Sequence, residues 1–346
     1  AVAPGCGAPA DAVSVQITAA GDFPDDQVIT ESAAIGAAGA LQLPTIPLDT
    51  RVLQVTVLGD SGTLTIGKTA PFDLDELSDG DPVPVFMAPP DGLCPTGPPL
   101  YPRAEPVLAR AGTGVLIVGG IGPDEVPVTA VEHYGPHTGI FTELGAIDYS
   151  PAEQGLLGAS ATALNEVPRG DGSADPGPGA GADATGPVVV IAGGGGPGYQ
   201  IIDATDGTLS AEFLLNPGRA RHGAVALDGQ RVLLVGGCGL PLDENEPGQC
   251  VAGRLLDSTT IIDLSAGGDA GEVRAGPTLQ VVRRDPTVVR EAEGSVLIIG
   301  GTDDSGQAVT AIERLTLDDD MPGGGVSVIL SIEEDTASGA VAAVPA

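Results

Sequence analysis

Short apolar segments that end in a pair of glycines recur along the second part of the chain. Each is a run of branched and small aliphatic residues, a pattern typical of a strand that is buried on both faces. Four such segments are present, at residues 115–120, 188–194, 232–237 and 296–301. A pattern that recurs in this way predicts a repeat architecture, and it outranks weaker local signals.

The intervals between these segments are unequal because two of them contain polar insertions. Residues 169–187 form a low-complexity insertion, and residues 239–249 form a polar loop between two cysteines. Without the insertions the period is roughly 45–55 residues, near the length of a four-stranded propeller blade. The glycine pairs are expected where converging sheets leave no room for a side chain. They are Gly119 and Gly120, Gly193 and Gly194, Gly236 and Gly237, and Gly300 and Gly301.

The residues around each glycine pair repeat as well. A further strand is predicted before each apolar segment, with residues 222–229 as the clearest case, and another follows each pair. This pattern resembles the kelch β-propeller family over residues 100–346. The resemblance rests on the glycine-paired strands, the Arg219 to His222 region, and a motif made of Glu132, Tyr134, Pro136, Thr138, Gly139 and Phe141. It implies about four blades of an incomplete kelch-type β-propeller, because kelch propellers usually close with six or seven.

Residues 1–96 lack the repeat and predict a separate domain. Alternating or apolar strands are expected at residues 12–18, 40–43, 51–58, 62–68 and 82–87, with a hairpin turn at residues 59–61. Five short antiparallel strands favour a small β-sandwich. The whole chain is therefore expected to be all-β, with a β-sandwich at 1–96 and propeller blades at 97–346.

The charge is strongly acidic and excludes one class of partner. Fourteen basic residues against 47 acidic residues give a formal net charge of −33. A field of this sign repels phosphate backbones, so we expect no nucleic-acid partner. The acidic runs at 243–246, 303–304 and 318–320 offer oxygen ligands that calcium prefers. No other cofactor is expected, and solvated loop charge is the favoured interpretation of these runs.

The four cysteines favour an exported protein. Cys238 and Cys250 flank the polar loop and predict a local disulfide. Small residues leading to Gly5 and Cys6 resemble a bacterial lipobox, in which the cysteine carries lipid. Cys6 and Cys94 could instead form a second disulfide, and these two alternatives exclude each other. The predicted location is extracytoplasmic: periplasmic, on the outer membrane as a lipoprotein, or secreted.

Arginines before the glycine pairs are the best candidates for ligand binding. Arg103, Arg221 and Arg284 stand at similar spacings before their pairs, and matching positions in a propeller form a ring around its axis. Guanidinium groups in a ring could clamp carboxylate ligands, with His222 beside Arg221. The alternative is that these arginines pair with nearby acids such as Glu105 or Asp285.

His133, Tyr134 and His137 form the most metal-like cluster, and imidazole and phenol groups can bind copper. Their place in one turn of one blade favours a structural role, so we expect no metal site and no catalytic residue. The sequence thus predicts a non-catalytic binding or adhesion protein of the bacterial cell envelope, with a protein or carbohydrate ligand at the cell surface. The alternative is a kelch-type enzyme, resembling galactose oxidase or a sugar epimerase.

Overall fold

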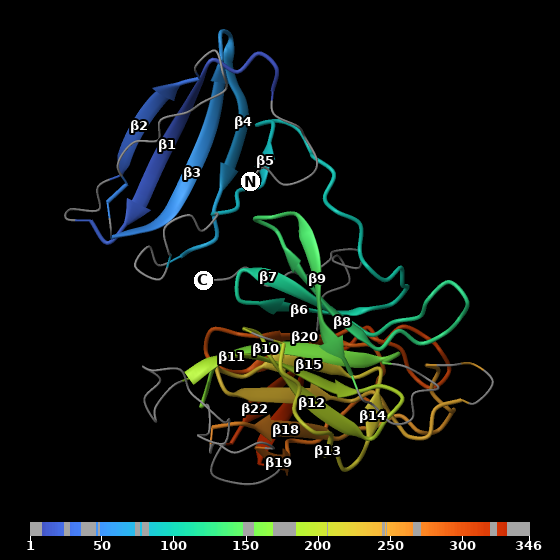
Figure 1. Ribbon diagram of the computed structural model, residues 1–346. Coiled ribbons are helices and arrows are strands. Elements are labelled where there is room, and N and C mark those ends of the chain that lie inside the picture. Colours follow the sequence, from blue (N-terminus) through green and yellow to red (C-terminus); the bar gives the residue numbers. More distant parts are fainter. Residues whose placement is uncertain are drawn as a thin grey trace. The chain divides into compact units, whose positions relative to one another are not determined.

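The computed structural model describes most of the chain, and within the described residues all helices and strands that it contains are β-strands (Figure 1). The described residues are 9–23, 28–35, 46–47, 49–72, 77, 83–147, 156–168, 185–205, 207–243, 246, 248–265, 271–318 and 324–330. Every strand pair among them is antiparallel, which confirms the all-β prediction. No helix in these ranges is long and apolar enough to cross a membrane.

The chain divides into two compact units. The first unit contains the chain up to Leu100 and the segment His133–Thr142, and the second contains Tyr101–Glu132 and the chain from Glu143 onward. The sequence places the domain boundary between residues 96 and 97, close to the first of these divisions.

The first unit contains one five-stranded sheet with the order β2-β1-β3-β4-β5. The strands are β1 (Ser14–Gly21), β2 (Ile29–Ala34), β3 (Thr50–Gly59), β4 (Gly62–Lys68) and β5 (Met87–Ala88). The predicted strands at 51–58 and 62–68 are confirmed as β3 and β4. The predicted strand at 40–43 lies outside the described residues. Among the described residues this unit holds a single sheet, without the second sheet of the predicted sandwich.

One apolar cluster covers this sheet. Ile17 and Ala19 of β1 and Leu53 of β3 are buried, and Phe23 and Phe72 pack against them. Ile17 and Ala19 are two residues apart, so they lie on the same face of β1. Alternation along β1 therefore places its core, as the sequence pattern indicates.

Four sheets of four strands follow, each with its strands side by side in chain order. Sheet I contains β6 (Val107–Ala111), β7 (Gly114–Val118), β8 (Ala130–Gly135) and β9 (Ile140–Ala146). Sheet II contains β10 (Ala159–Pro168), β11 (Thr185–Gly193), β12 (Gly198–Asp203) and β13 (Phe213–Leu214). Sheet III contains β15 (Gly223–Ala226), β16 (Arg231–Val235), β18 (Thr259–Asp263) and β19 (Glu272–Ala275). Sheet IV contains β20 (Thr287–Arg290), β21 (Val296–Ile299), β22 (Ile312–Leu317) and β23 (Gly325–Leu330).

A fifth, two-stranded pairing joins β14 (Arg219–Ala220) to β17 (Cys238–Gly239), at the start of sheet III.

Successive sheets pack face to face, and the apolar glycine-paired strands lie at the centre of this packing. On β16, Val232 and Leu234 belong to the core shared with sheet II, whereas Leu233 and Val235 belong to the core shared with sheet IV. All four side chains are fully buried. A strand covered on both faces needs a continuous apolar run rather than an alternating one, because each face must exclude water. Each buried side chain of this size contributes about 1.5–3 kcal/mol.

The glycine pairs share one backbone conformation. In all four pairs the first glycine has φ between 60° and 67° and the second has φ between 83° and 93°. A Cβ on Gly237 would lie 2.4 Å from the carbonyl oxygen of Ala220, which starts the same repeat. Both the positive φ and the close backbone approach therefore require glycine.

Candidate functional site

Three buried arginines hold the glycine pairs of sheets I, III and IV. The Nη1 group of Arg283 donates to the carbonyl oxygens of Gly300 (3.0 Å) and Ala311 (2.8 Å). Arg219 Nη1 makes the same two bonds to Gly236 (3.1 Å) and Ser258 (3.0 Å). Arg103 Nη1 donates at 2.9 Å to both Gly119 and Ala130. Each guanidinium group thus joins the glycine turn to the start of the third strand.

The second terminal nitrogen of each arginine binds a side chain on that third strand. Arg283 Nη2 forms an ion pair of 3.0 Å with Glu313, and both side chains are 0% exposed. Arg103 forms the same pair with Glu132. Arg219 instead donates to the hydroxyl of Thr260 at 2.6 Å, and its Nε has no partner. Burial without a carboxylate lowers the pKa of Arg219 to about 10.

These contacts show which arginines occupy equivalent positions. Arg103 is equivalent to Arg219 and Arg283. The spacing before the glycine pairs had predicted Arg221 and Arg284 as its equivalents, and this prediction is wrong. Arg103, Arg219 and Arg283 each stand two positions before a residue of positive φ. These residues are Glu105 (51°), Arg221 (53°) and Asp285 (52°). In sheet II, Leu156 occupies this position, before Gly158 (72°). Counting back from the glycines missed Arg219 and Arg283 by one or two residues, because the intervening hairpins differ in length.

The residues of positive φ link sheets II, III and IV in series. The Arg221 amide donates to the Gly158 carbonyl (2.6 Å), and the Asp285 amide donates to the Arg221 carbonyl (2.7 Å). The side chains of Arg221 and Asp285 form an ion pair through two nitrogen atoms. Arg221 Nη2 lies 2.9 Å from Asp285 Oδ2, and Arg221 Nε lies 3.0 Å from Oδ2 and 3.1 Å from Oδ1. They are 27% and 42% exposed. We call Gly158, Arg221 and Asp285 the rim.

The disulfide-bonded loop lies against the rim. Cys238 and Cys250 are bridged, with Cα atoms 5.8 Å apart, which confirms that predicted disulfide. Within the loop, the carbonyl of Gly248 and the Oε1 of Gln249 accept hydrogen bonds from Arg221 Nη1 at 3.3 Å and 3.4 Å. The alternatives for Cys6, a lipid or a disulfide with Cys94, concern a residue outside the described ranges. A disulfide favours an oxidising, extracytoplasmic location.

The other two predicted ligand-binding residues face the protein interior or a neighbouring turn. His222 is buried, and its Nε2 lies 2.8 Å from the Ser160 hydroxyl. Burial, together with the charge of Arg219, lowers the pKa of His222 to about 3, so it is neutral at pH 7. Arg284 Nε donates to the Thr302 hydroxyl at 2.9 Å. The structure therefore pairs Arg221 with Asp285 at the surface, whereas the side chains of Arg103, His222 and Arg284 have other partners: Glu132, Ser160 and Thr302.

The candidate metal groups have structural partners. The rings of Tyr134 and Phe141 lie 4.8 Å apart, as in an aromatic pair at a turn. In the acidic run at 303–304, the Asp303 carboxylate accepts bonds from the Ser305 hydroxyl and from the amides of Ser305 and Gln307, and these bonds lower its pKa. No group of three or more His, Cys, Asp or Glu within the described ranges is arranged to hold a metal ion. Residues 244–245 and 319–320 lie outside those ranges.

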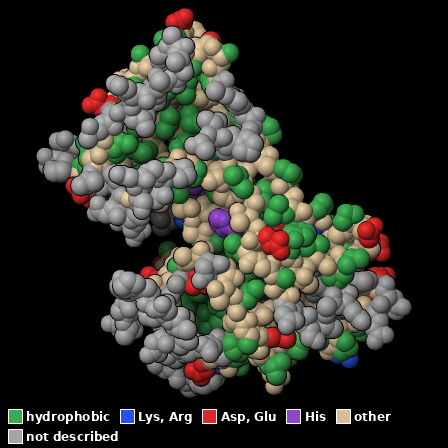
Figure 2. Space-filling view, in the orientation of Figure 1, with side chains coloured by type: hydrophobic (Ala, Val, Ile, Leu, Met, Phe, Trp, Pro, Cys, Tyr) green, Lys and Arg blue, Asp and Glu red, His purple; other side chains and the backbone are tan. Residues whose placement is uncertain are grey.

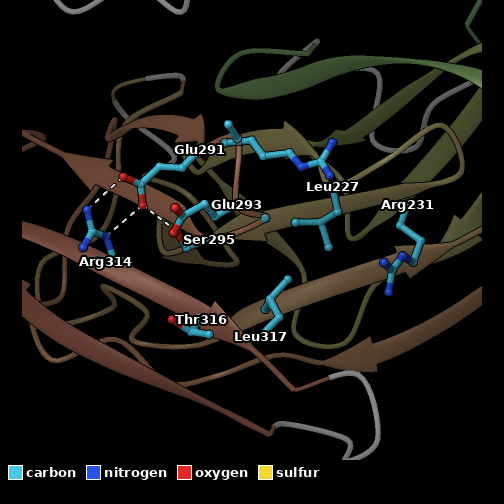
Figure 3. Close-up of a pocket in the computed structure, with 11 residues that line it drawn as sticks. Leu227, Arg231, Glu291, Glu293, Ser295, Arg314, Thr316 and Leu317 are labelled. Carbon is cyan, nitrogen blue, oxygen red and sulfur yellow. Dashed lines mark hydrogen bonds and ion pairs between the residues drawn. The ribbon is translucent and has the colours of Figure 1, made fainter.

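A pocket of about 780 Å³ lies between sheets III and IV (Figure 3). It is formed at the ends of β15 and β20 that are opposite to Arg221 and Asp285. Its wall contains the ion pair of Arg314 and Glu291, whose two bonds measure 2.8 Å and 2.9 Å. Hydrogen bonds from Arg314 and Ser295 lower the pKa of Glu291. No sequence pattern pointed to this pocket.

Acidic side chains are scattered over the face shown in Figure 2, where basic side chains are few.

No protein-family model matches the chain, and no curated protein matches it. Among solved structures, one described as the structure of YjhT is similar, with 14% sequence identity and a TM-score of 0.46. The match covers 96% of this chain and 100% of that one.

Proposed function

We propose that the chain is a non-catalytic binding protein of the bacterial cell envelope, built on a kelch-type β-propeller. The succession of four four-stranded sheets supports the propeller. The first strands of neighbouring sheets, β6 and β10, β10 and β15, and β15 and β20, lie against one another (Figure 1). Adjacent first strands with face-to-face sheets are what radial packing of blades requires.

The rim is the observation that carries the binding function. Arg221 and Asp285 sit on backbone that is fixed by hydrogen bonds from sheet to sheet, and a disulfide-bonded loop supports the guanidinium group. Polar groups held in place before binding lose little conformational entropy when a ligand arrives. Their partial exposure leaves both open to a ligand.

The chemistry of the rim suits a protein or carbohydrate ligand at the cell surface. A guanidinium group binds carboxylates through two parallel hydrogen bonds, and a carboxylate accepts hydrogen bonds from hydroxyl groups. A ligand that carries both groups could replace the internal Arg221–Asp285 pair without leaving either charge unpaired.

The disulfide supports a location outside the cytoplasm. We extend this to the bacterial envelope or medium, with attachment through a lipid on Cys6 as one alternative and a disulfide between Cys6 and Cys94 as the other. The net charge of −33 opposes a nucleic-acid partner.

The test is binding of the purified chain to arrays of glycans and of envelope proteins, with Arg221→Gln and Asp285→Asn as variants. We expect specific binding that both variants weaken at least tenfold. Arg110→Gln is the control, because Arg110 is an exposed arginine of β6 whose one hydrogen bond within the described part of the chain goes to the carbonyl of Gly112. Absence of binding on both arrays, or equal binding by the Arg221 variant, would contradict the proposal.

A further inference from the structure

The pocket between sheets III and IV presents charges of both signs at short range. Arg290 ends β20, and Glu293 lies in the turn that leads to β21. The Glu291 amide donates to the Ser295 carbonyl (2.8 Å), and the Gly294 amide donates to the Glu291 carbonyl (3.0 Å). This tight turn holds the two side chains three residues apart, so their Cα atoms are separated by no more than about 10 Å.

Most other charged side chains of the pocket form an ion pair with a neighbouring side chain of opposite charge. Arg314 pairs with Glu291, and Arg231 pairs with Asp228 at 2.6 Å. By contrast, the side chains of Arg290 and Glu293 form no hydrogen bond or ion pair with any described residue, nor with each other. Glu293 interacts with Arg314 through its charge alone. The pocket thus offers one cation and one anion to a ligand.

Leucine side chains also line the pocket. Leu227 is buried beneath the pocket, and Leu317 is partly buried beside it. In Figure 3 both leucines lie between Arg231 on one side and Glu293 with the Glu291–Arg314 pair on the other. A volume of about 780 Å³ falls in the range of small-molecule sites. The lining of this pocket is mainly polar, and the two leucines contribute to its apolar part.

We propose that this pocket binds a small dipolar ligand of dipeptide size, with its carboxylate on Arg290 and its ammonium group at Glu293. A simple anion would meet the carboxylates of Glu291 and Glu293, and a simple cation would meet three guanidinium groups. A ligand with both charges and an apolar body satisfies Arg290, Glu293 and the two leucines together. This site is independent of the rim, because it lies at the other end of the strands.

Isothermal titration calorimetry with leucyl-leucine tests the proposal. We expect binding by the unmodified chain, with at least tenfold weaker binding for Arg290→Gln and for Glu293→Gln. N-acetylated leucyl-leucine and leucyl-leucine amide each lack one charge and should also bind at least tenfold more weakly. Arg110→Gln changes a residue of β6 that does not line the pocket, and this variant should bind as the unmodified chain does.

Both pocket variants change exposed side chains, so the chain should remain folded, and its thermal midpoint should change little. Absence of heat with leucyl-leucine would overturn the proposal. Equal affinity for the acetylated or amidated peptide would overturn the assignment of the two charges. Neither outcome bears on the array test of the rim, which depends on Arg221 and Asp285.

Discussion

Arg221 and Asp285 are joined twice, through the main chain at 2.7 Å and through their side chains at 2.9 Å. Because the main-chain bond fixes both residues, the side-chain pair needs little further ordering. Its exposure limits its contribution to stability, since water screens exposed ion pairs.

Arg221→Ala should therefore lower the free energy of unfolding by only about 1 kcal/mol. Urea denaturation followed by circular dichroism measures this change. A loss of several kcal/mol would show that the rim is mainly a structural element and would weaken its assignment as a binding surface.

The buried pair of Arg283 and Glu313 should behave differently. Arg283→Met leaves the Glu313 carboxylate buried without its cation, and we expect a loss of about 3–5 kcal/mol. The double variant Arg283→Met with Glu313→Leu removes the unpaired charge and should recover part of that loss. Denaturant titration of both variants provides the comparison, and a double variant less stable than the single one would contradict this account.

Gly237→Ala should be more damaging than Gly253→Ala, although both glycines have positive φ. A Cβ at Gly237 meets the Ala220 carbonyl oxygen, whereas a Cβ at Gly253 meets no atom within 4 Å. Gly253→Ala should lower stability by about 1 kcal/mol through backbone strain alone. Thermal unfolding should show a clearly larger loss for Gly237→Ala, and equal losses would mean that the close approach is not required.

Removal of the disulfide by Cys250→Ser should lower the free energy of unfolding by about 2–3 kcal/mol, because the bridge closes a loop of sequence separation 12. Since the loop also supports Arg221, ligand binding at the rim should weaken in the same variant. Reducing agent should reproduce both effects in the unmodified chain and leave Cys250→Ser unaffected at this loop.

The buried His222 predicts a pH dependence of stability. Its folded pKa is about 3 and its unfolded pKa is near 6.5, so between these values the unfolded state binds a proton that the folded state does not. Stability therefore falls as the pH drops below 6.5, by about 2 kcal/mol at pH 5 from this residue.

His222→Gln should lack this part of the pH dependence. The measurement is denaturant unfolding of both proteins at pH 7.5 and pH 5. His133 and His137 are present in both and cancel in the comparison. The same pH dependence in both proteins would exclude His222 as its source.

The sequence predicted the repeating part of the fold because its signals are local. A run such as residues 232–235 followed by Gly236 and Gly237 specifies a buried strand and the turn after it. The disulfide between Cys238 and Cys250 was predictable for the same reason.

The candidate sites were harder to predict because they depend on hairpin lengths and on packing between sheets. Arg219 and Arg221 are only two residues apart, yet Arg219 is fully buried and Arg221 is partly exposed at the surface. The pocket combines Leu227 and Arg231 with a turn near residue 293, so no local pattern contains it. The sequence would reveal buried pairs such as Arg283 and Glu313 only if the four repeats were aligned at the start of the first strand of each sheet, where the arginines then fall at one position.

The guanidinium groups of the three buried arginines hold glycine turns and third strands of their own sheets: Arg103 in sheet I, Arg219 in sheet III and Arg283 in sheet IV. A copied sheet would therefore bring the partners of its buried guanidinium group with it, while its main chain would still bond to the neighbouring sheet, as Arg221 and Asp285 do. Duplication or loss of one sheet within a gene would therefore leave no buried arginine without its partners, which gives this architecture a simple way to change length during evolution.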